Sequence, residues 1–291
     1  MITGLIGAGA VGSSLLYFGA EKGHDTILLG DPDRLEKYKK GIRINGRDIA
    51  VQVQEKKDQP LDILFLSVKS IDFEQAVENL QKSIDKKTII VSLMNGVSTE
   101  TELRKRFTNP VVHAVVRGSF SRGKEGTVFK EDQINITIGS EGKNKEAVTK
   151  VEAFLKQISY PYILSEDIIT NMWSKFCINV SENLIAAVLD FNYGQMKKKE
   201  ILEAVKLVQR EVVEVGRHYG AKLSEENISD NIKALIEEID EGVPSTLQDL
   251  RAGRKTEVDL FAGEMIRLGE KAGIETPYSK LLYYLVKGKE Q

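Results

Sequence analysis

The chain has 291 residues, 41% of them hydrophobic and 29% charged, and a formal net charge of -2. This length exceeds that of one ordinary domain, so we expect two domains in a globular protein. The 41 basic and 43 acidic residues are well mixed, which argues against nucleic acid and membrane surfaces as partners. Cys177 is the only cysteine, so an internal disulfide and a cysteine metal cluster are excluded. We expect a cytoplasmic enzyme without a bound metal, and a homodimer is compatible with the sequence.

The first half of the chain alternates short apolar runs with amphipathic stretches, as in strand–helix units built on a parallel sheet. The pattern predicts strands at 2–6, 26–29, 63–68, 88–93, 111–116 and 134–138, and helices at 11–22, 73–84 and 99–107. Asn45-Gly46 predicts a hairpin within 42–54, and the polar segment 117–126 is expected to be a loop.

From about residue 165 the pattern changes to helical periodicity, which continues to residue 287. Ser165 is a good N-cap, and the two acidic residues that follow it suit the first turn of a helix. We therefore predict an α/β Rossmann-type dinucleotide-binding domain over 1–165, followed by an all-α domain over 166–291 that binds substrate and carries the catalytic residues.

A glycine-rich turn lies between the first predicted strand and helix, and it reads Gly7-Ala8-Gly9-Ala10-Val11-Gly12. This is the dinucleotide-binding fingerprint in its proper setting. The first glycine permits the tight turn, the second lets the backbone approach the pyrophosphate, and the third lets helix and sheet pack closely. The phosphates would lie at the positive N-terminus of the helix. A glycine turn without a ligand is the alternative, and the position between strand and helix argues against it.

Polar residues follow three of the predicted strands, at the carboxyl edge where ligands bind in such sheets. Asp31 lies 19 residues after Gly12, where an acid commonly accepts hydrogen bonds from the adenosine ribose. Lys69 and Asn95 follow the next two predicted strands. Each also has an ordinary explanation, because Asp31 precedes a proline in a turn, Lys69 can be an exposed lysine, and Asn95-Gly96 can be a hairpin turn.

A second group of polar residues lies in the predicted helical domain. Lys175, Asn179 and Asn183 fall at i, i+4 and i+8 and share one helical face among apolar neighbours. The face predicts either a pocket with placed polar groups or a solvated surface. Further along, Ser245 with Gln248 matches a capping box, and Glu257 can be a first-turn acid of the following helix.

Together these residues resemble the ketopantoate reductase (2-dehydropantoate 2-reductase) family over nearly the whole chain. The resemblance rests on the following motifs: Gly7-x-Gly9-x-x-Gly12, Ser67-Val68-Lys69, Asn95-Gly96, Trp173-x-Lys175-x-x-x-Asn179-x-x-x-Asn183 and Ser245-x-x-Gln248-Asp249-x-x-x-Gly253-Arg254-x-Thr256-Glu257. It implies NAD(P)H-dependent reduction of a 2-oxo acid, ketopantoate, to pantoate in pantothenate and coenzyme A biosynthesis.

The resemblance also implies roles for individual residues. Lys175 matches the general acid of the family, and Glu257 matches a carboxylate that holds substrate and acid in register. Three residues match groups that hydrogen-bond the substrate: Asn179, Asn183 and Ser245. Two match residues near the nicotinamide and the cofactor phosphates: Asn95 and Lys69. Because Asn95 falls in the first predicted domain and Lys175 in the second, we expect a cleft between domains that closes on substrate.

The chain departs from the family pattern at three places. The family usually ends its second strand with an arginine that meets the NADP 2′-phosphate, and here Asp31 stands there, so NADPH is the family default while Asp31 favours NADH. Arg34 is a substitute partner for that phosphate. Gly242 stands where the family often has an asparagine, three residues before Ser245, and the segment 117–126 matches poorly.

Three other functions are open at this point. A reductase of another 2-oxo acid would keep every motif. A β-hydroxyacid-type dehydrogenase shares the two-domain plan and a lysine, but its lysine lies in a different motif. A non-catalytic NAD-sensing regulator would be expected to lose Lys175 or Glu257, and both are present.

Overall fold

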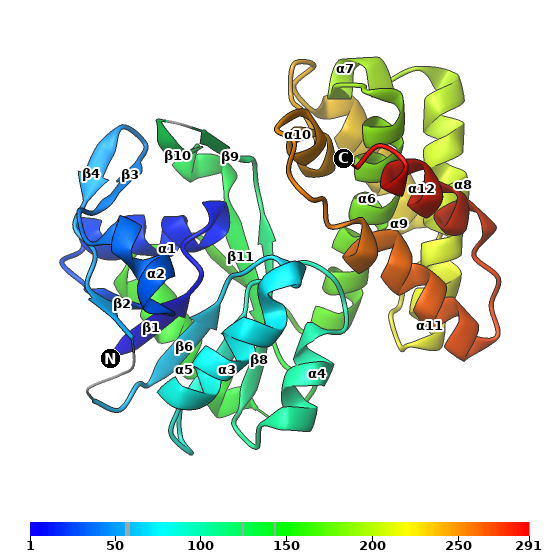
Figure 1. Ribbon diagram of the computed structural model, residues 1–291. Helices are drawn as coiled ribbons and strands as arrows, with labels where there is room; N and C mark the ends of the chain where they lie inside the picture. Colours follow the sequence, from blue (N-terminus) through cyan, green and yellow to red (C-terminus); the bar gives the residue numbers. More distant parts are fainter. Residues whose placement is uncertain (56–58, 124, 143, 291) are drawn as a thin grey trace. The chain divides into compact units, whose positions relative to one another are not determined.

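The computed structural model describes residues 1–55, 59–123, 125–142 and 144–290, which form two compact units (Figure 1). The first unit comprises Met1–Met94 and Ser98–Ile168, and the second comprises Asn95–Val97 and Ile169–Gln291. The division after Ile168 lies close to the boundary at 165 that the sequence predicts. The short segment Asn95–Val97 is the difference, because the sequence pattern places it in the first domain.

The first unit is built on an eight-stranded sheet with the order β12-β11-β8-β7-β6-β1-β2-β5. The six strands from β8 to β5 in this order are parallel, and β11 runs antiparallel to β8. The strands are β1 (Thr3–Ile6), β2 (Thr26–Leu29), β5 (Val53–Gln54), β6 (Ile63–Leu66), β7 (Ile89–Ser92), β8 (Val111–Arg117), β11 (Asn135–Gly139) and β12 (Tyr162–Leu164). The predicted Rossmann-type sheet is confirmed.

Helices cover both faces of this sheet, as a buried parallel sheet requires. Alternate residues of one strand point to opposite faces, so Phe65 packs in one hydrophobic cluster and Leu64 in another. The first cluster includes residues of α1 (Ala10–Glu21) and α5 (Lys145–Gln157), and the second includes residues of α3 (Phe73–Ser83) and α4 (Thr99–Arg106). A short helix α2 (Pro32–Leu35) with the turn η1 (Glu36–Tyr38) follows β2.

The segment predicted as a loop at 117–126 is instead largely strand, so that prediction is wrong. It contains β9 (Phe120–Gly123) and the start of β10 (Gly126–Phe129), which pair in an antiparallel ladder. These two strands join β3 (Ile42–Ile44) and β4 (Arg47–Ile49) in a second, four-stranded sheet. The predicted hairpin at Asn45-Gly46 is confirmed, and both residues have the positive φ that its tight turn needs (48° and 76°).

The second unit is all helical, as predicted. Its helices are α6 (Ile168–Leu189), α7 (Tyr193–Met196), α8 (Lys199–His218), α9 (Glu225–Glu237), α10 (Ser245–Arg251), the π-helical turn η4 (Asp259–Gly263), α11 (Glu264–Ala272) and α12 (Pro277–Lys287). Helix α6 supplies much of the core of this unit through Trp173, Phe176 and Leu184, which are buried against residues of α8. None of the described helices has the length and apolar composition that crossing a bilayer requires.

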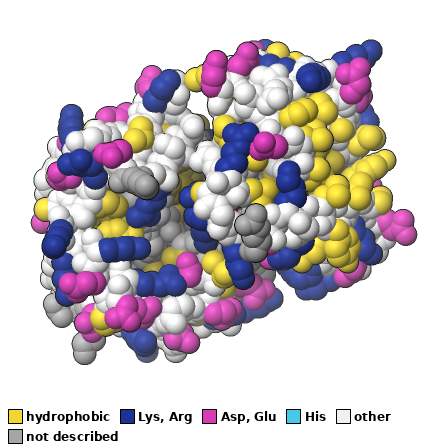
Figure 2. Space-filling model, turned by 45° about the horizontal axis from the view of Figure 1, so that its top comes forward, with side chains coloured by type: hydrophobic (Ala, Val, Ile, Leu, Met, Phe, Trp, Pro, Cys, Tyr) yellow, Lys and Arg dark blue, Asp and Glu magenta, His cyan; other side chains and the backbone are white. Residues whose placement is uncertain are grey.

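The surface of the second unit is not uniformly polar. Figure 2 shows hydrophobic side chains gathered over part of this unit, among scattered basic and acidic ones. On α12 the exposed apolar side chains include Leu281 and Tyr284, whose exposed fractions are 58% and 64%. The buried Leu282 and Val286 lie on the opposite side of the same helix. Helix α12 therefore has one face in the core and one apolar face in solvent.

Candidate functional site

The glycine-rich turn has the local geometry that a pyrophosphate needs. Gly7 has a φ of +95°, and a Cβ built on it would lie 2.3 Å from the carbonyl oxygen of Ser67. A Cβ on Gly12 would lie 2.1 Å from the carbonyl oxygen of Gly7, so both positions exclude any side chain. At Gly9 the nearest heavy atom would be 3.9 Å away, so the space beside this residue is open. The backbone N–H groups at the start of α1 can therefore meet an anion directly.

The carboxylate of Asp31 follows β2 and accepts a hydrogen bond from Asn79 Nδ2 at 3.3 Å. A cavity of about 620 Å³ borders Asp31, and its lining includes Lys39, Asn79 and Lys82. Arg34, the substitute partner for a 2′-phosphate, is engaged elsewhere, because its Nη2 lies 2.6 Å from Asp72 Oδ1. Asp31 thus presents a carboxylate at the end of β2, while the guanidinium of Arg34 already has Asp72 as its counter-ion.

Two further basic residues belong to the first unit, and one of them contacts the glycine-rich turn. Lys69 immediately precedes the turn η2 (Ser70–Asp72), after the carboxyl end of β6. Arg122, on β9, donates from Nη1 to the carbonyl oxygen of Ala8 at 2.6 Å. The sequence analysis missed Arg122, since nothing local distinguishes it from the other polar residues of a segment expected to be a loop.

The central finding is a hydrogen-bonded chain of three side chains within the second unit. Lys175 Nζ donates to Asn95 Oδ1 at 2.8 Å, and Asn95 Nδ2 donates to Glu257 Oε2 at 2.9 Å. The ammonium group can only donate and the carboxylate can only accept, so the orientation of the amide between them is fixed. Asn95 thus links the predicted general acid to the predicted carboxylate.

The position of Asn95 corrects the sequence analysis, which assigned it to the first domain and Lys175 to the second. The structure groups Asn95–Val97 with the second unit. Gly96 explains this locally, because its φ is +95° and a Cβ there would lie 2.9 Å from Leu260 Cδ1. The missing side chain lets the backbone approach Leu260 closely, which brings Asn95 to Glu257.

The polar face of α6 continues through the two predicted asparagines. Asn183 Nδ2 lies 3.3 Å from Asn179 Oδ1 and 3.2 Å from Ser245 Oγ. The exposed fractions of Asn179 and Asn183 are only 7% and 6%, so the alternative of a solvated helical face is wrong. The capping-box interpretation of Ser245 is also wrong, because Ser245 is the first residue of α10 and Pro244 stands at the N-cap without a side-chain cap bond, while Gln248 Nε2 donates to the carbonyl oxygen of Val243 at 2.8 Å.

Tyr193 fills the space beside Gly242. A Cβ on Gly242 would lie 2.7 Å from Tyr193 Cδ2, and the backbone N–H of Tyr193 donates to the Gly242 carbonyl oxygen at 2.9 Å. Burial raises the pKa of the Tyr193 phenol, and the nearby charges of Glu182 and Glu238 raise it further. An asparagine at position 242 would therefore require the aromatic ring to move.

A buried carboxyl group lies on α6 directly before Asn183. Burial, together with the charge of Glu238, raises the pKa of Glu182 to about 8, although a hydrogen bond from Gln209 opposes this. Gln209 Nε2 lies 3.4 Å from Glu182 Oε1 and 3.1 Å from Ser181 Oγ. The buried Glu182 carboxyl therefore gives up its proton less readily than an exposed glutamate does.

Two family models match the chain, one described as ketopantoate reductase PanE/ApbA over residues 3–142 and the other as the C-terminal part of the same family over residues 167–290. The chain belongs to the ketopantoate reductase family. It is accordingly an oxidoreductase, and its cofactor is a nicotinamide dinucleotide, in agreement with the glycine-rich turn. The family predicted from the sequence motifs is confirmed, which favours it over a β-hydroxyacid-type dehydrogenase.

Individual relatives agree with the family assignment. The chain is 29% identical to a 2-dehydropantoate 2-reductase of Streptococcus pyogenes serotype M3 over 308 residues, covering 100% of the chain and 98% of the relative. It is 28% identical to the enzyme of the same name from Pyrococcus horikoshii, with 98% and 96% covered.

Solved structures share the same fold. One is a PanE/ApbA family ketopantoate reductase from Ralstonia eutropha, with a TM-score of 0.86, 25% identity, and 100% and 98% of the two chains covered. Another is D-mandelate dehydrogenase with NADH and anilino(oxo)acetate, with a TM-score of 0.90, 24% identity and the same coverage. At this identity the second likeness shows the fold alone.

Proposed function

We propose that this chain reduces 2-dehydropantoate to pantoate, with a nicotinamide dinucleotide as hydride donor and Lys175 as general acid. The observation that carries the proposal is the Lys175–Asn95–Glu257 hydrogen-bonded chain. The names of the curated relatives support the substrate. The proposal includes substrate contacts from Asn179, Asn183 and Ser245.

The dinucleotide, when bound, supplies the hydride, and the protein supplies position and charge. The Lys175 ammonium donates a hydrogen bond to the keto oxygen and stabilises the negative charge that develops on it. As hydride from the bound dinucleotide reached the carbonyl carbon, Lys175 would transfer its proton to the oxygen, which would complete the alcohol. The neutral amine then recovers a proton from solvent. Asn95 holds the amine in one direction throughout, because its own amide is anchored on Glu257.

The remaining polar groups suit the rest of the substrate. A 2-oxo acid carries a carboxylate, and 2-dehydropantoate also carries a hydroxyl group. Asn183 Nδ2 already donates to Asn179 and Ser245, so Asn179 Nδ2 and the Ser245 hydroxyl can donate to the carboxylate, and Asn183 Oδ1 can accept from the substrate hydroxyl. Placing such groups in a largely apolar surrounding is what gives a small-molecule site its specificity.

The test of the activity is spectrophotometric oxidation of NADH and NADPH by the full chain with a panel of 2-oxo acids. We expect 2-dehydropantoate to have the highest kcat/KM. If no 2-oxo acid is reduced with either cofactor, the chain is not a 2-oxo acid reductase. Dinucleotide binding without any turnover would instead support the NAD-sensing regulator.

A reductase of another 2-oxo acid is the second candidate. The Tyr193 ring packed beside Gly242 favours it, because an aromatic surface stands where many family members offer an amide. D-mandelate dehydrogenase, with the same fold, is named for an aromatic substrate. The panel should therefore include phenylglyoxylate, and a higher kcat/KM for this acid than for 2-dehydropantoate would select the second candidate.

We also propose that NADH is used in preference to NADPH. The Asp31 carboxylate would repel a 2′-phosphate by roughly a few kcal/mol at an effective dielectric constant near 20. With NADH it can accept hydrogen bonds from the ribose hydroxyls. Arg34 is a weak substitute, because its ion pair with Asp72 offsets its charge. An NADH-bound protein of the same fold is consistent with this choice.

Asp31→Arg should shift the ratio of kcat/KM values toward NADPH by about tenfold or more, since it reverses the charge beside the 2′-position. Both ratios are measured under the same conditions on the wild type and the variant. Asp33→Arg is the matched control, because it makes the same charge change on an exposed residue of α2. A wild type that already prefers NADPH tenfold would show that Asp31 acts only as a turn residue.

Assembly and location remain proposals as well. A ketopantoate reductase from Staphylococcus aureus with the same fold, at a TM-score of 0.84 and 21% identity, is described as dimeric. The exposed apolar face of α12 supports a homodimer for this chain too. We place the enzyme in the cytoplasm, on the sequence evidence alone.

A further inference from the structure

We propose that Glu290, just beyond the end of α12, is a positioning residue that holds Glu257 in register with Asn95 and Lys175. This inference rests on the proposed function, in which Glu257 anchors the amide that directs the general acid. Neither the sequence motifs nor the family resemblance assigns any role to Glu290. The contacts on either side of Glu257 support this role.

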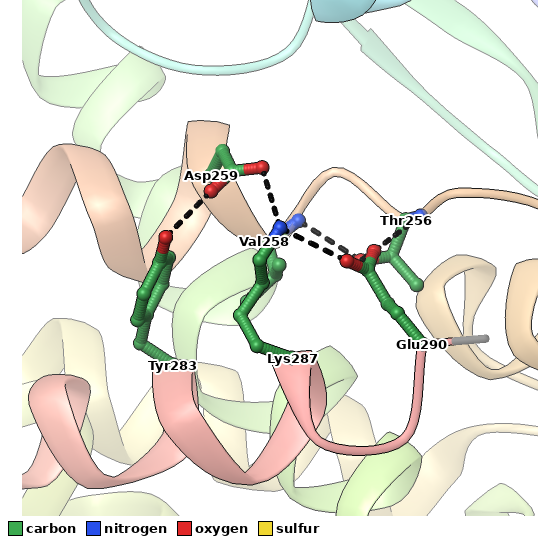
Figure 3. A network of polar contacts seen from close by, with 6 residues as sticks. All are labelled: Thr256, Val258, Asp259, Tyr283, Lys287 and Glu290. Atoms are coloured by element: carbon green, nitrogen blue, oxygen red, sulfur yellow. Dashed lines mark hydrogen bonds and ion pairs between the residues drawn. The ribbon is translucent and has the colours of Figure 1, made fainter.

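Thr256, directly before Glu257, is bonded to the Glu290 carboxylate, and Val258, directly after it, is linked to that carboxylate through the Thr256 hydroxyl (Figure 3). Thr256 donates to Glu290 Oε1 twice, from its backbone N at 2.9 Å and from Oγ1 at 2.7 Å. The backbone N of Val258 donates in turn to Thr256 Oγ1 at 3.2 Å. The Glu290 carboxylate therefore fixes the backbone before Glu257 directly, and it orients the hydroxyl that holds the backbone after it.

Helix α12 also contacts the turn that follows Glu257. Lys287 Nζ lies 3.1 Å from Asp259 Oδ2 and 3.0 Å from Glu290 Oε2, so it joins the two carboxylates. Tyr283 donates from its hydroxyl to Asp259 Oδ1 at 2.8 Å. Asp259 begins the π-helical turn η4, a rare geometry that is frequent at functional sites. The segment carrying Glu257 is thus held at both ends by α12 and the residue beyond it.

Burial decides which of these contacts is strongest. The exposed fractions of Thr256 and Val258 are 9% and 0%, and the Glu290 side chain is 14% exposed. The Lys287–Asp259 pair is far more exposed, at 37% and 62%, and a surface ion pair contributes little. Hydrogen bonds to a partly buried carboxylate are stronger. Glu290 is therefore the main link.

The Glu290 carboxyl is charged at neutral pH. Burial on its own raises the pKa of Glu290, but the hydrogen bonds from Thr256 and the Lys287 ammonium outweigh it and hold the pKa below its usual value. The carboxylates of Glu290 and, next, Asp259 in turn raise the pKa of Lys287. The Glu290 carboxylate is thus available as an acceptor for Thr256 at neutral pH.

Losing this acceptor should affect the chemistry through Glu257. Thr256 would keep two donors in a buried place without their acceptor, and the backbone would shift to satisfy them. Because Glu257 lies between the two tied residues, its carboxylate would move relative to Asn95. A misplacement of about 1 Å in a catalytic arrangement can cost about 100-fold in rate.

The experiment compares three full-length variants. Glu290→Ala removes the acceptor, and Glu290→Gln keeps one amide oxygen that can accept both Thr256 bonds. Glu211→Gln is the matched control, because Glu211 holds the opposite end of α12 by accepting from Tyr278 N at 2.6 Å and Ser279 N at 2.9 Å. It loosens the same helix without touching the Glu257 segment.

We expect Glu290→Ala to lower kcat/KM for the best 2-oxo acid by about 10- to 100-fold. Glu290→Gln should recover most of this loss, and Glu211→Gln should lower the Tm with less than about a threefold change in kcat/KM. In a Glu257→Gln background, adding Glu290→Ala should change kcat/KM less than about threefold, because the residue acts through Glu257. Equal losses from Glu290→Ala in both backgrounds would overturn the inference, as would a Glu290→Ala variant that behaves like Glu211→Gln.

Amide hydrogen exchange gives a readout that needs no activity. Glu290→Ala should speed exchange at Thr256 and Val258 relative to the wild type, and Glu211→Gln should leave both amides unchanged. Unchanged exchange at Thr256 in Glu290→Ala would overturn the inference even in an active enzyme. If the wild type reduces no 2-oxo acid, the proposed function fails, and exchange still decides whether Glu290 holds this segment.

Discussion

Replacing Lys175 with alanine is expected to lower kcat by at least about 100-fold, while the affinity for the dinucleotide changes little. The ammonium group has two tasks in the proposed reaction, since it stabilises the charge on the keto oxygen and gives up the proton. The variant loses both together. The residues proposed to bind the pyrophosphate and the adenosine ribose, at the glycine-rich turn and Asp31, belong to the first unit and are unchanged.

Steady-state kinetics give kcat, and fluorescence titration of the reduced dinucleotide gives its affinity. The control is Lys206→Ala, which removes a half-buried lysine of α8 whose Nζ lies 2.8 Å from Glu203 Oε1. Near-normal turnover by a folded Lys175→Ala protein would remove this lysine from the mechanism. Recovery of activity on adding a small primary amine would support its role as the proton donor.

The elements that could be predicted are those whose signal is local. β1 and β2 are short apolar runs, and the glycines between β1 and α1 are fixed by contacts within a few residues or with the adjacent strand. The α6 motif could be located because its spacing places three polar groups on one face. The motif alone did not decide whether this face lines a pocket or faces water, and the burial of Asn179 and Asn183 decides it.

The parts that could not be predicted depend on contacts distant in sequence. β9 and β10 pair with each other, but they join β3 through the pairing of Thr127 with Ile44, and nothing within 117–126 itself indicates that partner. Asn95 lies 162 residues before Glu257, and Glu290 lies 34 residues after Thr256. Tertiary contacts of this kind leave no periodic pattern in the sequence. The motifs therefore locate Lys175 and Glu257, but they do not indicate that Glu290 holds the segment around Glu257.

Glu257→Gln is expected to lower kcat/KM by about 10- to 100-fold, although it keeps the size of the side chain. Its amide oxygen can still accept from Asn95 Nδ2, so the geometry at 2.9 Å need not change. The negative charge is lost, and with it the stronger, charge-assisted form of this hydrogen bond. Without that carboxylate at the end of the chain, the Lys175 ammonium loses its nearby counter-charge.

The pH–rate profile separates this role from a structural one. An ammonium without its counter-charge gives up its proton at lower pH, so the alkaline limb of kcat/KM should move to lower pH in Glu257→Gln. Glu270→Gln, on the exposed side of α11, is the control and should leave the profile in place. Unchanged kinetics in Glu257→Gln together with a lower Tm would show that Glu257 acts only as an acid at the start of a helix. A shifted profile with an unchanged Tm would require that its charge acts on the reacting groups, since a residue that only supports the fold has no reason to move the pH dependence.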